Sequence, residues 1–170
     1  KFAFDFEWEN YFHKDSSFYI NSVCFGKDFT HSLYVSQRVK DGIVDRFRKI
    51  KGSRPNVEKF KPDIYIDVHI DKGSCTFSLN SSGRNLNQRG YRKKTNEAPL
   101  NEVLASGLIL LSNWNKKDDF LDPMCGSGTF LFEACMIAKN IAPNINRKHF
   151  AFKNWNDWDQ DLFINILKTL

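Results

Sequence analysis

The sequence predicts a mixed α/β chain, in which an α+β region is followed by the opening of a doubly wound, Rossmann-like domain. Two patterns support this prediction. Residues 63–71 alternate apolar and polar side chains and pass through Lys72-Gly73 into a second alternating run, which is typical of a β-hairpin. Residues 120–138 read as a short apolar strand, a glycine-containing turn and an unbroken helix, which is the first unit of a doubly wound fold.

The other elements of the first region follow from residue type and spacing. Residues 17–25 are rich in strand-forming side chains, and residues 53–62 contain two prolines and read as a loop. Between them, apolar side chains near helical spacing predict a helix from Ser32 to about Ile50 with a basic opposite face. The hairpin has one apolar and one polar face, so we expect one side of its sheet to be open to water.

Three helices are expected in the second region. The first begins near Pro99, whose fixed φ and missing N–H suit a first helical turn, and it runs to Trp114. Its apolar stripe is made by Leu100, Val103, Leu104, Leu108, Leu111 and Trp114. The helix after the glycine turn is broken by Pro143 at the latest, and the last helix starts at about Trp158.

The overall composition is that of a folded protein with a mild positive charge. A hydrophobic share of 41% and 16 phenylalanines are ample for a core, and no run of about 18 apolar residues predicts a membrane span. The net charge of +5 favours an anionic partner without identifying one. The chain begins without methionine or a signal-peptide pattern, so we expect part of a longer cytoplasmic protein. Its four cysteines and four histidines lack the spacing of metal ligands, so no metal site is expected.

The most informative segment is the turn between Asp122 and Thr129. Gly126 and Gly128 remove side chains that would keep a ligand from the backbone, and the helix that begins there points free N–H groups toward it. Leu131 replaces the third glycine of a dinucleotide fingerprint, and the lysine of a phosphate loop is missing. A ligand with an ammonium and a carboxylate on one carbon suits this turn, because Asp122 can face the ammonium and the turn amides the carboxylate.

The run Asp-Pro-x-Cys-Gly-Ser-Gly-Thr at residues 122–129 resembles motif I of class I S-adenosylmethionine-dependent methyltransferases. The form is that of enzymes that methylate the exocyclic amino groups of bases. The resemblance implies S-adenosyl-L-methionine as the cofactor. It also implies that the methionine end of the cofactor is held by Asp122, Cys125, Gly126, Ser127, Gly128 and Thr129. Glu133, one helical turn further on, is a weaker candidate for the same role and reads equally well as a solvent-facing helix acid.

Positive charge gathers in two segments, residues 38–54 and a polar stretch that begins at Ser82. Cations of this kind bind phosphate through counterion release, and an aromatic ring among them can stack on an unpaired base. The RNA contacts predicted in the second segment are Arg84, Arg89, Tyr91, Arg92, Lys93 and Lys94. The alternatives are a solvated helix face for the first segment and a flexible joint for the second.

The second segment also carries a family resemblance. Residues 82–92, read as Ser-Gly-Arg-x-Leu-x-x-Arg-Gly-Tyr-Arg, and residues 97–105 resemble the junction of bacterial THUMP-domain RNA methyltransferases, which are similar to 23S ribosomal RNA guanine-N2 methyltransferases. Residues 39–47 resemble the THUMP helix of that family, and the tail at 152–159 resembles the segment after its motif I. The resemblance implies an RNA-capturing THUMP domain that feeds a Rossmann-like methyltransferase domain, with the residues around Ala98 to Leu100 near the cofactor.

From these boundaries we predict an incomplete THUMP-like region at residues 1–82, a basic linker at 83–97 and the opening of the methyltransferase domain at 98–170. The expected reaction is methyl transfer to an exocyclic base nitrogen, with guanine N2 of ribosomal RNA as the favoured target. The family's catalytic Asn/Asp-Pro-Pro-Phe/Tyr does not occur, so the catalytic residues are expected downstream of residue 170 and this segment is not expected to methylate by itself.

Three alternatives stay open at the level of sequence. One is an adenine-N6 DNA methyltransferase, because amino-methylating enzymes share much of motif I. Another is an RNA-binding module without catalytic activity, in which the glycine turn is vestigial. A nicotinamide oxidoreductase is the weakest of the three, because of Leu131. The sequence makes no prediction of oligomeric state.

Overall fold

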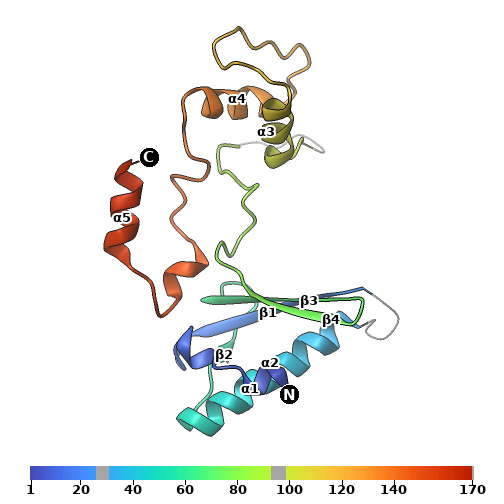
Figure 1. The fold of residues 1–170 in the computed structure, drawn as a ribbon, viewed down its shortest axis with the longest axis vertical. Coiled ribbons are helices and arrows are strands. Elements are labelled where there is room, and N and C mark those ends of the chain that lie inside the picture. The colour runs from blue at the N-terminus through green and yellow to red at the C-terminus, as the bar shows by residue number, and fades with distance from the viewer. Residues whose placement is uncertain (26–30, 93–98, 170) are drawn as a thin grey trace. The chain divides into compact units, whose positions relative to one another are not determined.

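The computed structural model describes residues 1–25, 31–92 and 99–169, and the chain divides into two compact units (Figure 1). Unit 1 consists of Lys1–Gly83 and His149–Gln160, and unit 2 consists of Arg84–Lys148 and Asp161–Leu170. The chain therefore leaves unit 1 after Gly83 and returns to it near His149. The predicted division by contrast assigns every residue from 98 onward to the second domain.

Unit 1 is built on a four-stranded sheet in the order β2-β1-β3-β4. Its strands are β1 (Ser17–Cys24), β2 (Asn56–Val57), β3 (Ile64–Asp71) and β4 (Ser74–Leu79). Strand β1 runs parallel to both β2 and β3, whereas β4 is antiparallel to β3. The predicted first strand and the predicted hairpin are confirmed, and β2 is a short strand within the segment that the sequence predicts as a loop.

The hairpin between β3 and β4 turns on two residues in the left-handed region. Lys72 has φ 47° and Gly73 has φ 78°. Two such residues in succession match the right-handed twist of the paired strands, which is why glycine in the second position is a strong hairpin signal. Asp71 then pairs with Ser74, and this register keeps the apolar side chains of β3 on one face of the sheet.

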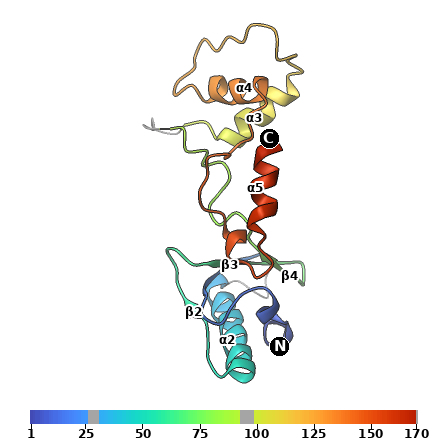
Figure 2. The ribbon, with the colours of Figure 1, turned by 90° about the vertical axis from the view of Figure 1, so that its left-hand side faces the viewer.

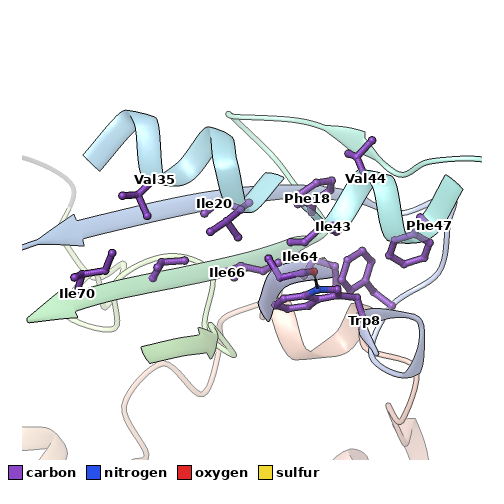
Figure 3. Packing of buried hydrophobic residues seen from close by; sticks show 14 residues of the cluster. Trp8, Phe18, Ile20, Val35, Ile43, Val44, Phe47, Ile64, Ile66 and Ile70 are labelled. Carbon is purple, nitrogen blue, oxygen red and sulfur yellow. Dashed lines mark hydrogen bonds between the residues drawn. The ribbon is translucent and has the colours of Figure 1, made fainter. Parts of the chain in front are cut away.

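Helix α2 (Ser32–Lys51) lies along one face of the sheet, as Figures 1 and 2 show. Its buried side packs with the apolar side chains of β1 and β3 into one cluster (Figure 3). The members of this core from the three elements are Val35, Val39, Ile43, Val44, Phe47, Phe18, Ile20, Ile64, Ile66, Val68 and Ile70. The predicted helix is confirmed, because its apolar spacing and the alternation of β3 meet in this core.

The N-terminal segment forms two short helices, α1 (Phe2–Asp5) and η1 (Trp8–Asn10). The buried indole of Trp8 donates its N–H to the carbonyl of Ala3 over 2.7 Å. Arg46 of α2 reaches the same segment, where its Nε donates to Oε2 of Glu9 over 2.8 Å. One cation of the predicted basic helix face therefore has its partner within unit 1.

The segment that returns to unit 1 carries η2 (Ala151–Asn154) and binds close to the point where the chain leaves. The N–H of Phe152 donates to the carbonyl of Ser81 over 3.0 Å, and Nδ2 of Asn154 donates to the carbonyl of Asp63 over 3.1 Å. Trp155 packs against the core cluster. These contacts are why residues 149–160 belong to unit 1.

Unit 2 contains helices α3 (Glu102–Leu111) and α4 (Thr129–Ala138), and α5 (Gln160–Thr169) continues into it from the returning segment. The predicted start of α3 at Pro99 is wrong. The side chain of Asn101 accepts from the N–H groups of Val103 over 2.9 Å and Leu104 over 3.2 Å, so it caps the helix there. The start of α4 at Thr129 confirms the predicted helix after the glycine turn.

The buried face of α3 differs from the predicted apolar stripe. The residues that α3 buries are Glu102, Ala105 and Ile109. Leu104 of the stripe is 53% exposed and Leu111 is 80% exposed. A stripe read from helical spacing indicates which side chains share a face, but the packing partner decides which face is buried.

The strand predicted at Phe120-Leu121 does not form, so this part of the prediction is wrong. The backbone there is irregular, and Leu121 is 86% exposed. A strand needs a neighbour for its N–H and C=O groups. Among the described residues, every strand belongs to the sheet of unit 1 and none lies in unit 2.

Two kinds of feature are absent from the part of the chain that the structure describes. None of its helices combines the length and the apolar character that crossing a membrane requires. Nowhere in it do three histidine, cysteine, aspartate or glutamate side chains gather in a group that could hold a metal ion.

Candidate functional site

The turn before α4 is held by hydrogen bonds between its own residues, one to a side chain and one between backbone groups. Oδ1 of Asp122 accepts from the N–H of Met124 over 3.2 Å, and the N–H of Gly128 donates to the carbonyl of Cys125 over 2.7 Å. Gly126 and Gly128 have φ values of 54° and 73°, in the left-handed region that favours glycine. The turn therefore needs glycine at both positions to reach the start of the helix.

The space around the two glycines is unequal. A Cβ atom built on Gly128 would lie 3.7 Å from the ring of Phe132, whereas one built on Gly126 would meet no atom within 4 Å. Gly126 and Cys125 are exposed, and Asp122 and Ser127 are half-buried. The outer side of the turn is thus accessible to a small ligand that approaches the backbone.

Helix α4 begins at this turn. The N–H of Phe132 donates to the carbonyl of Gly128 over 3.0 Å, which closes the first helical turn. The preceding N–H groups have no carbonyl of the helix to bind, and the helix dipole places partial positive charge at them. Thr129 is buried, with its Oγ1 3.3 Å from Oγ of Ser127. The arrangement suits a carboxylate at the turn amides.

Glu133 lies one turn into α4 and is 1% exposed. Its Oε1 accepts from the hydroxyl of Tyr91 over 3.0 Å, and its Oε2 lies 3.4 Å from Nη2 of Arg89. The interpretation of Glu133 as a solvent-facing acid is therefore wrong. The ring of Tyr91 also stacks on Phe132, with the ring centroids 4.7 Å apart.

Arg92 makes the second set of contacts with the helices of unit 2. Its Nη2 donates to Oγ1 of Thr129 over 2.7 Å and also to the carbonyl of Leu100. Its Nη1 lies 3.2 Å from Oε1 of Glu102, an acid that is 6% exposed. Sequence reasoning missed Glu102. The available signal was an acid at the start of an apolar helix that comes after an acid-free basic segment.

The hydroxyl of Tyr91 remains a donor throughout the physiological pH range. Burial raises the pKa of Tyr91 well above its usual value, and the hydrogen bond to Glu133 raises it further. Because the phenol stays protonated, it stabilises the buried carboxylate of Glu133 by donating a hydrogen bond to it.

The structure thus places three of the predicted RNA contacts inside unit 2. The side chains of Arg89 and Arg92 are 9% and 14% exposed, and Tyr91 is half-buried. Arg84 is exposed, and its carbonyl accepts from Arg147 over 2.8 Å. Lys93 and Lys94 lie outside the described residues, as does Ala98 of the segment predicted to lie near the cofactor. RNA contact by this segment stays a prediction.

Two family models match the chain. Residues 1–80 match the THUMP domain, and residues 89–168 match the RMKL-like methyltransferase domain. The two matches leave out only residues 81–88 and the last two residues of the chain. The match to the THUMP domain falls within unit 1. The match to the methyltransferase domain also includes residues 149–160, which belong to unit 1.

The relatives of this chain include methyltransferases. It is 44% identical over 166 residues to "Ribosomal RNA large subunit methyltransferase K/L" from Shewanella pealeana, a match that covers 97% of this chain and 23% of that protein. Among solved structures, "SMU.472, a putative methyltransferase complexed with SAH" is 33% identical with a TM-score of 0.83, covering 98% of this chain and 44% of the other.

A second solved structure carries a title that names a different substrate. A "predicted N6-adenine-specific DNA methylase" from Listeria monocytogenes is 28% identical with a TM-score of 0.83, covering 95% of this chain and 42% of the other. The chain spans less than half the length of each of these three relatives.

Proposed function

Because this chain belongs to the THUMP-containing, RMKL-like methyltransferases, we propose that it captures RNA with unit 1 and seats S-adenosyl-L-methionine at the glycine turn of unit 2. The complete protein transfers a methyl group to an exocyclic nitrogen of a base in ribosomal RNA, with guanine N2 as the favoured atom. An enzyme that acts on ribosomal RNA in bacteria works in the cytoplasm.

The seat of the cofactor is made by Asp122, Cys125, Gly126, Ser127, Gly128 and Thr129. Support comes first from the turn itself, where the Cβ position of Gly126 is open and the N-cap residue Gly128 has no side chain to occupy the first N–H groups of α4. Further support comes from the relative that was solved with SAH. The carboxylate of Asp122 is suited to the ammonium of the cofactor's methionine portion, and the turn amides are suited to its carboxylate.

When bound, the cofactor supplies an electrophilic methyl group on a sulfonium centre. The residues of this chain contribute binding and orientation, because such a transfer depends chiefly on the alignment of nitrogen, carbon and sulfur. The family's catalytic tetrapeptide is absent from residues 1–170. We therefore assign no catalytic residue here and expect no methyl transfer from this segment alone.

The RNA-binding surface on unit 1 is proposed at the C-terminal end of α2. Lys51 and Arg54 are exposed there. Arg46 is engaged with Glu9, and Arg48 lies 3.4 Å from Asp45, so these two cations are partly neutralised within the unit. Support for RNA comes from the THUMP match and from the ribosomal RNA methyltransferase relatives.

The observation that carries the cofactor proposal is the open, left-handed Gly126 in the turn that leads into α4. Isothermal titration of the full-length protein with S-adenosyl-L-methionine tests it. Gly126→Val and the milder Gly126→Ala should remove or weaken cofactor binding and leave RNA affinity unchanged. Gly73→Val is the matched control, because Gly73 also has positive φ and open space but lies in the β3–β4 hairpin of unit 1. Retention of full cofactor affinity by Gly126→Val would contradict the proposal.

The second candidate is an adenine-N6 DNA methyltransferase, which the Listeria relative favours. Competition between ribosomal RNA fragments and duplex DNA for the full-length protein separates the two. Methyl transfer to the DNA with no transfer to the RNA would favour this second candidate.

A further inference from the structure

Two acids are buried in unit 2, and each is bound by the same short segment of the chain. Glu133 on α4 and Glu102 on α3 are 1% and 6% exposed. Residues 89–92, here called the clasp, supply Arg89 and Tyr91 to the first acid and Arg92 to the second. A buried carboxylate without such partners would be strongly destabilising, so the clasp and the two acids depend on each other.

The clasp binds α4 at the end that carries the glycine turn. Arg92 donates to Thr129, the first residue of the helix and the one directly after Gly128. Tyr91 and Arg89 hold Glu133, one turn further along. The clasp therefore holds the N-terminal part of α4 at two points on one face, one turn apart, and the glycine turn is directly attached to the first of them.

The chemistry of Arg92 is specific to arginine. Its two terminal nitrogens diverge, so that Nη1 lies 3.2 Å from Glu102 while Nη2 donates to Thr129 over 2.7 Å. A lysine ammonium is a single point on a flexible stem and does not reproduce such a fork. The conservative change of Arg92 to lysine thus keeps the charge but breaks the link between α3 and α4.

We propose that Arg89, Tyr91 and Arg92 are positioning residues for the cofactor: they hold Thr129 and Glu133, and through them the Cys125–Gly128 turn, without touching the cofactor themselves. This inference rests on the proposed function, since it assigns the clasp to the cofactor seat. It differs from the prediction that these three residues bind RNA, and the experiment distinguishes the two.

The test uses the full-length protein with Arg92→Lys and Tyr91→Phe. Tyr91→Phe keeps the ring that stacks on Phe132 and removes only the hydroxyl, so it guards against simple failure to fold. The dissociation constant for S-adenosyl-L-methionine is measured by calorimetry, and that for ribosomal RNA fragments by fluorescence anisotropy over a range of salt. Arg92→Lys should weaken cofactor binding by about tenfold or more, and Tyr91→Phe by less, with RNA affinity and its salt dependence unchanged.

A double-mutant cycle separates positioning from a general structural role. Thr129→Val and Arg92→Lys each remove the same hydrogen bond, so their effects on cofactor affinity should not add. Arg84→Gln is the control, because Arg84 precedes the clasp, is exposed and should leave cofactor affinity unchanged. Strict additivity of the two changes would contradict the proposed link.

The remaining outcomes are distinguishable. Loss of RNA affinity with unchanged cofactor affinity in both clasp variants would overturn the positioning role and restore these residues as RNA contacts. Unchanged affinity for both ligands would overturn it as well. Failure of the unaltered protein to bind S-adenosyl-L-methionine would overturn the proposed function, and the positioning role with it.

Discussion

Arg46 of α2 and Glu9 of η1 form a two-bonded ion pair, with Nε and Nη2 of the arginine donating to the two carboxylate oxygens. The pair ties the N-terminal segment to the helix that covers the sheet. Arg46 extends the attachment by donating to the carbonyl of Asp5 over 2.9 Å. A cation that the charge pattern groups with a possible RNA surface thus serves the stability of unit 1.

This ion pair makes a prediction about pH. The hydrogen bonds from Arg46 hold the pKa of Glu9 below its usual value. Its contribution to stability is therefore present above the unfolded-state pKa and is lost as the pH falls through the lower folded-state pKa. Glu9→Gln should lower the thermal midpoint of unfolding at pH 7, and the difference from the unaltered protein should shrink as the pH falls through the lowered folded-state pKa of Glu9. Calorimetry at a series of pH values checks this, with the exposed Glu58→Gln as control.

Tyr91 makes the opposite prediction at alkaline pH. Because its folded-state pKa is raised, the unfolded state ionises first, and stability falls as the pH rises above the ordinary tyrosine value of about 10. Tyr91→Phe should reduce this loss of stability at alkaline pH. Thermal unfolding, monitored by circular dichroism at a series of pH values, checks this. The exposed Tyr34→Phe serves as control, and an equal reduction in both variants would contradict the role assigned to Tyr91.

Gly83 is predicted to tolerate no side chain. It has φ 74°, and a Cβ atom there would lie 3.2 Å from the ring of Tyr65 and 3.4 Å from Cβ of Ala151. Gly83→Ala should destabilise unit 1 by about 1–3 kcal/mol, as measured by urea unfolding. Gly52 shares the positive φ but has open space around it, so Gly52→Ala should lower the free energy of unfolding by less. An equal loss of stability in Gly83→Ala and Gly52→Ala would mean that crowding by Tyr65 plays no part.

A substitution in the core of unit 1 should lower stability more than Gly83→Ala does. Phe18 is fully buried between α2 and the sheet. Phe18→Ala should lower the free energy of unfolding by about 3–5 kcal/mol, because it leaves a cavity as well as removing buried apolar surface. Phe60 is 85% exposed, so Phe60→Ala should change the stability by no more than about 0.5 kcal/mol.

The proposed RNA surface is tested by charge removal. Lys51→Gln and Arg54→Gln in the full-length protein should weaken binding to ribosomal RNA fragments and reduce its dependence on salt, because fewer counterions are released. Lys72→Asn removes a cation from the hairpin turn instead and should have little effect. A salt dependence that is unchanged in the Lys51 and Arg54 variants and reduced in Lys72→Asn would place the surface elsewhere.

The parts of the fold that the sequence predicts well are those fixed by local pattern. Strict alternation through Ile64–Asp71 can be satisfied only by a strand with one buried face, and Gly73 accommodates the positive φ that closes the hairpin. Helix α2 likewise matches its prediction because five apolar residues at helical spacing meet one sheet face. In these elements the local preference and the tertiary packing agree.

The features that escaped prediction depend on partners distant in the sequence. Glu133 is buried because Tyr91 binds it from 42 residues upstream, and nothing beside Glu133 in the sequence records that contact. The returning segment binds Asp63 from 91 residues away in the same manner. The prediction of a strand at Phe120-Leu121 failed for a related reason, because a strand forms only beside another strand to which it can hydrogen-bond. For the candidate site, the turn was predicted as a local motif, whereas its supporting network was not.

The hydrogen bond between Phe152 and Ser81 has a consequence for how such proteins can recombine. A chimera that took only residues 1–83 from a relative would pair them with this chain's own residues 149–160, whose Asn154 and Trp155 pack against the surface of the original unit 1. An exchange that keeps unit 1 whole therefore requires three crossover points, after Gly83, after Lys148 and after Gln160. The two segments that must be inherited together to form unit 1 are therefore separated along the gene by the sequence that encodes residues 84–148.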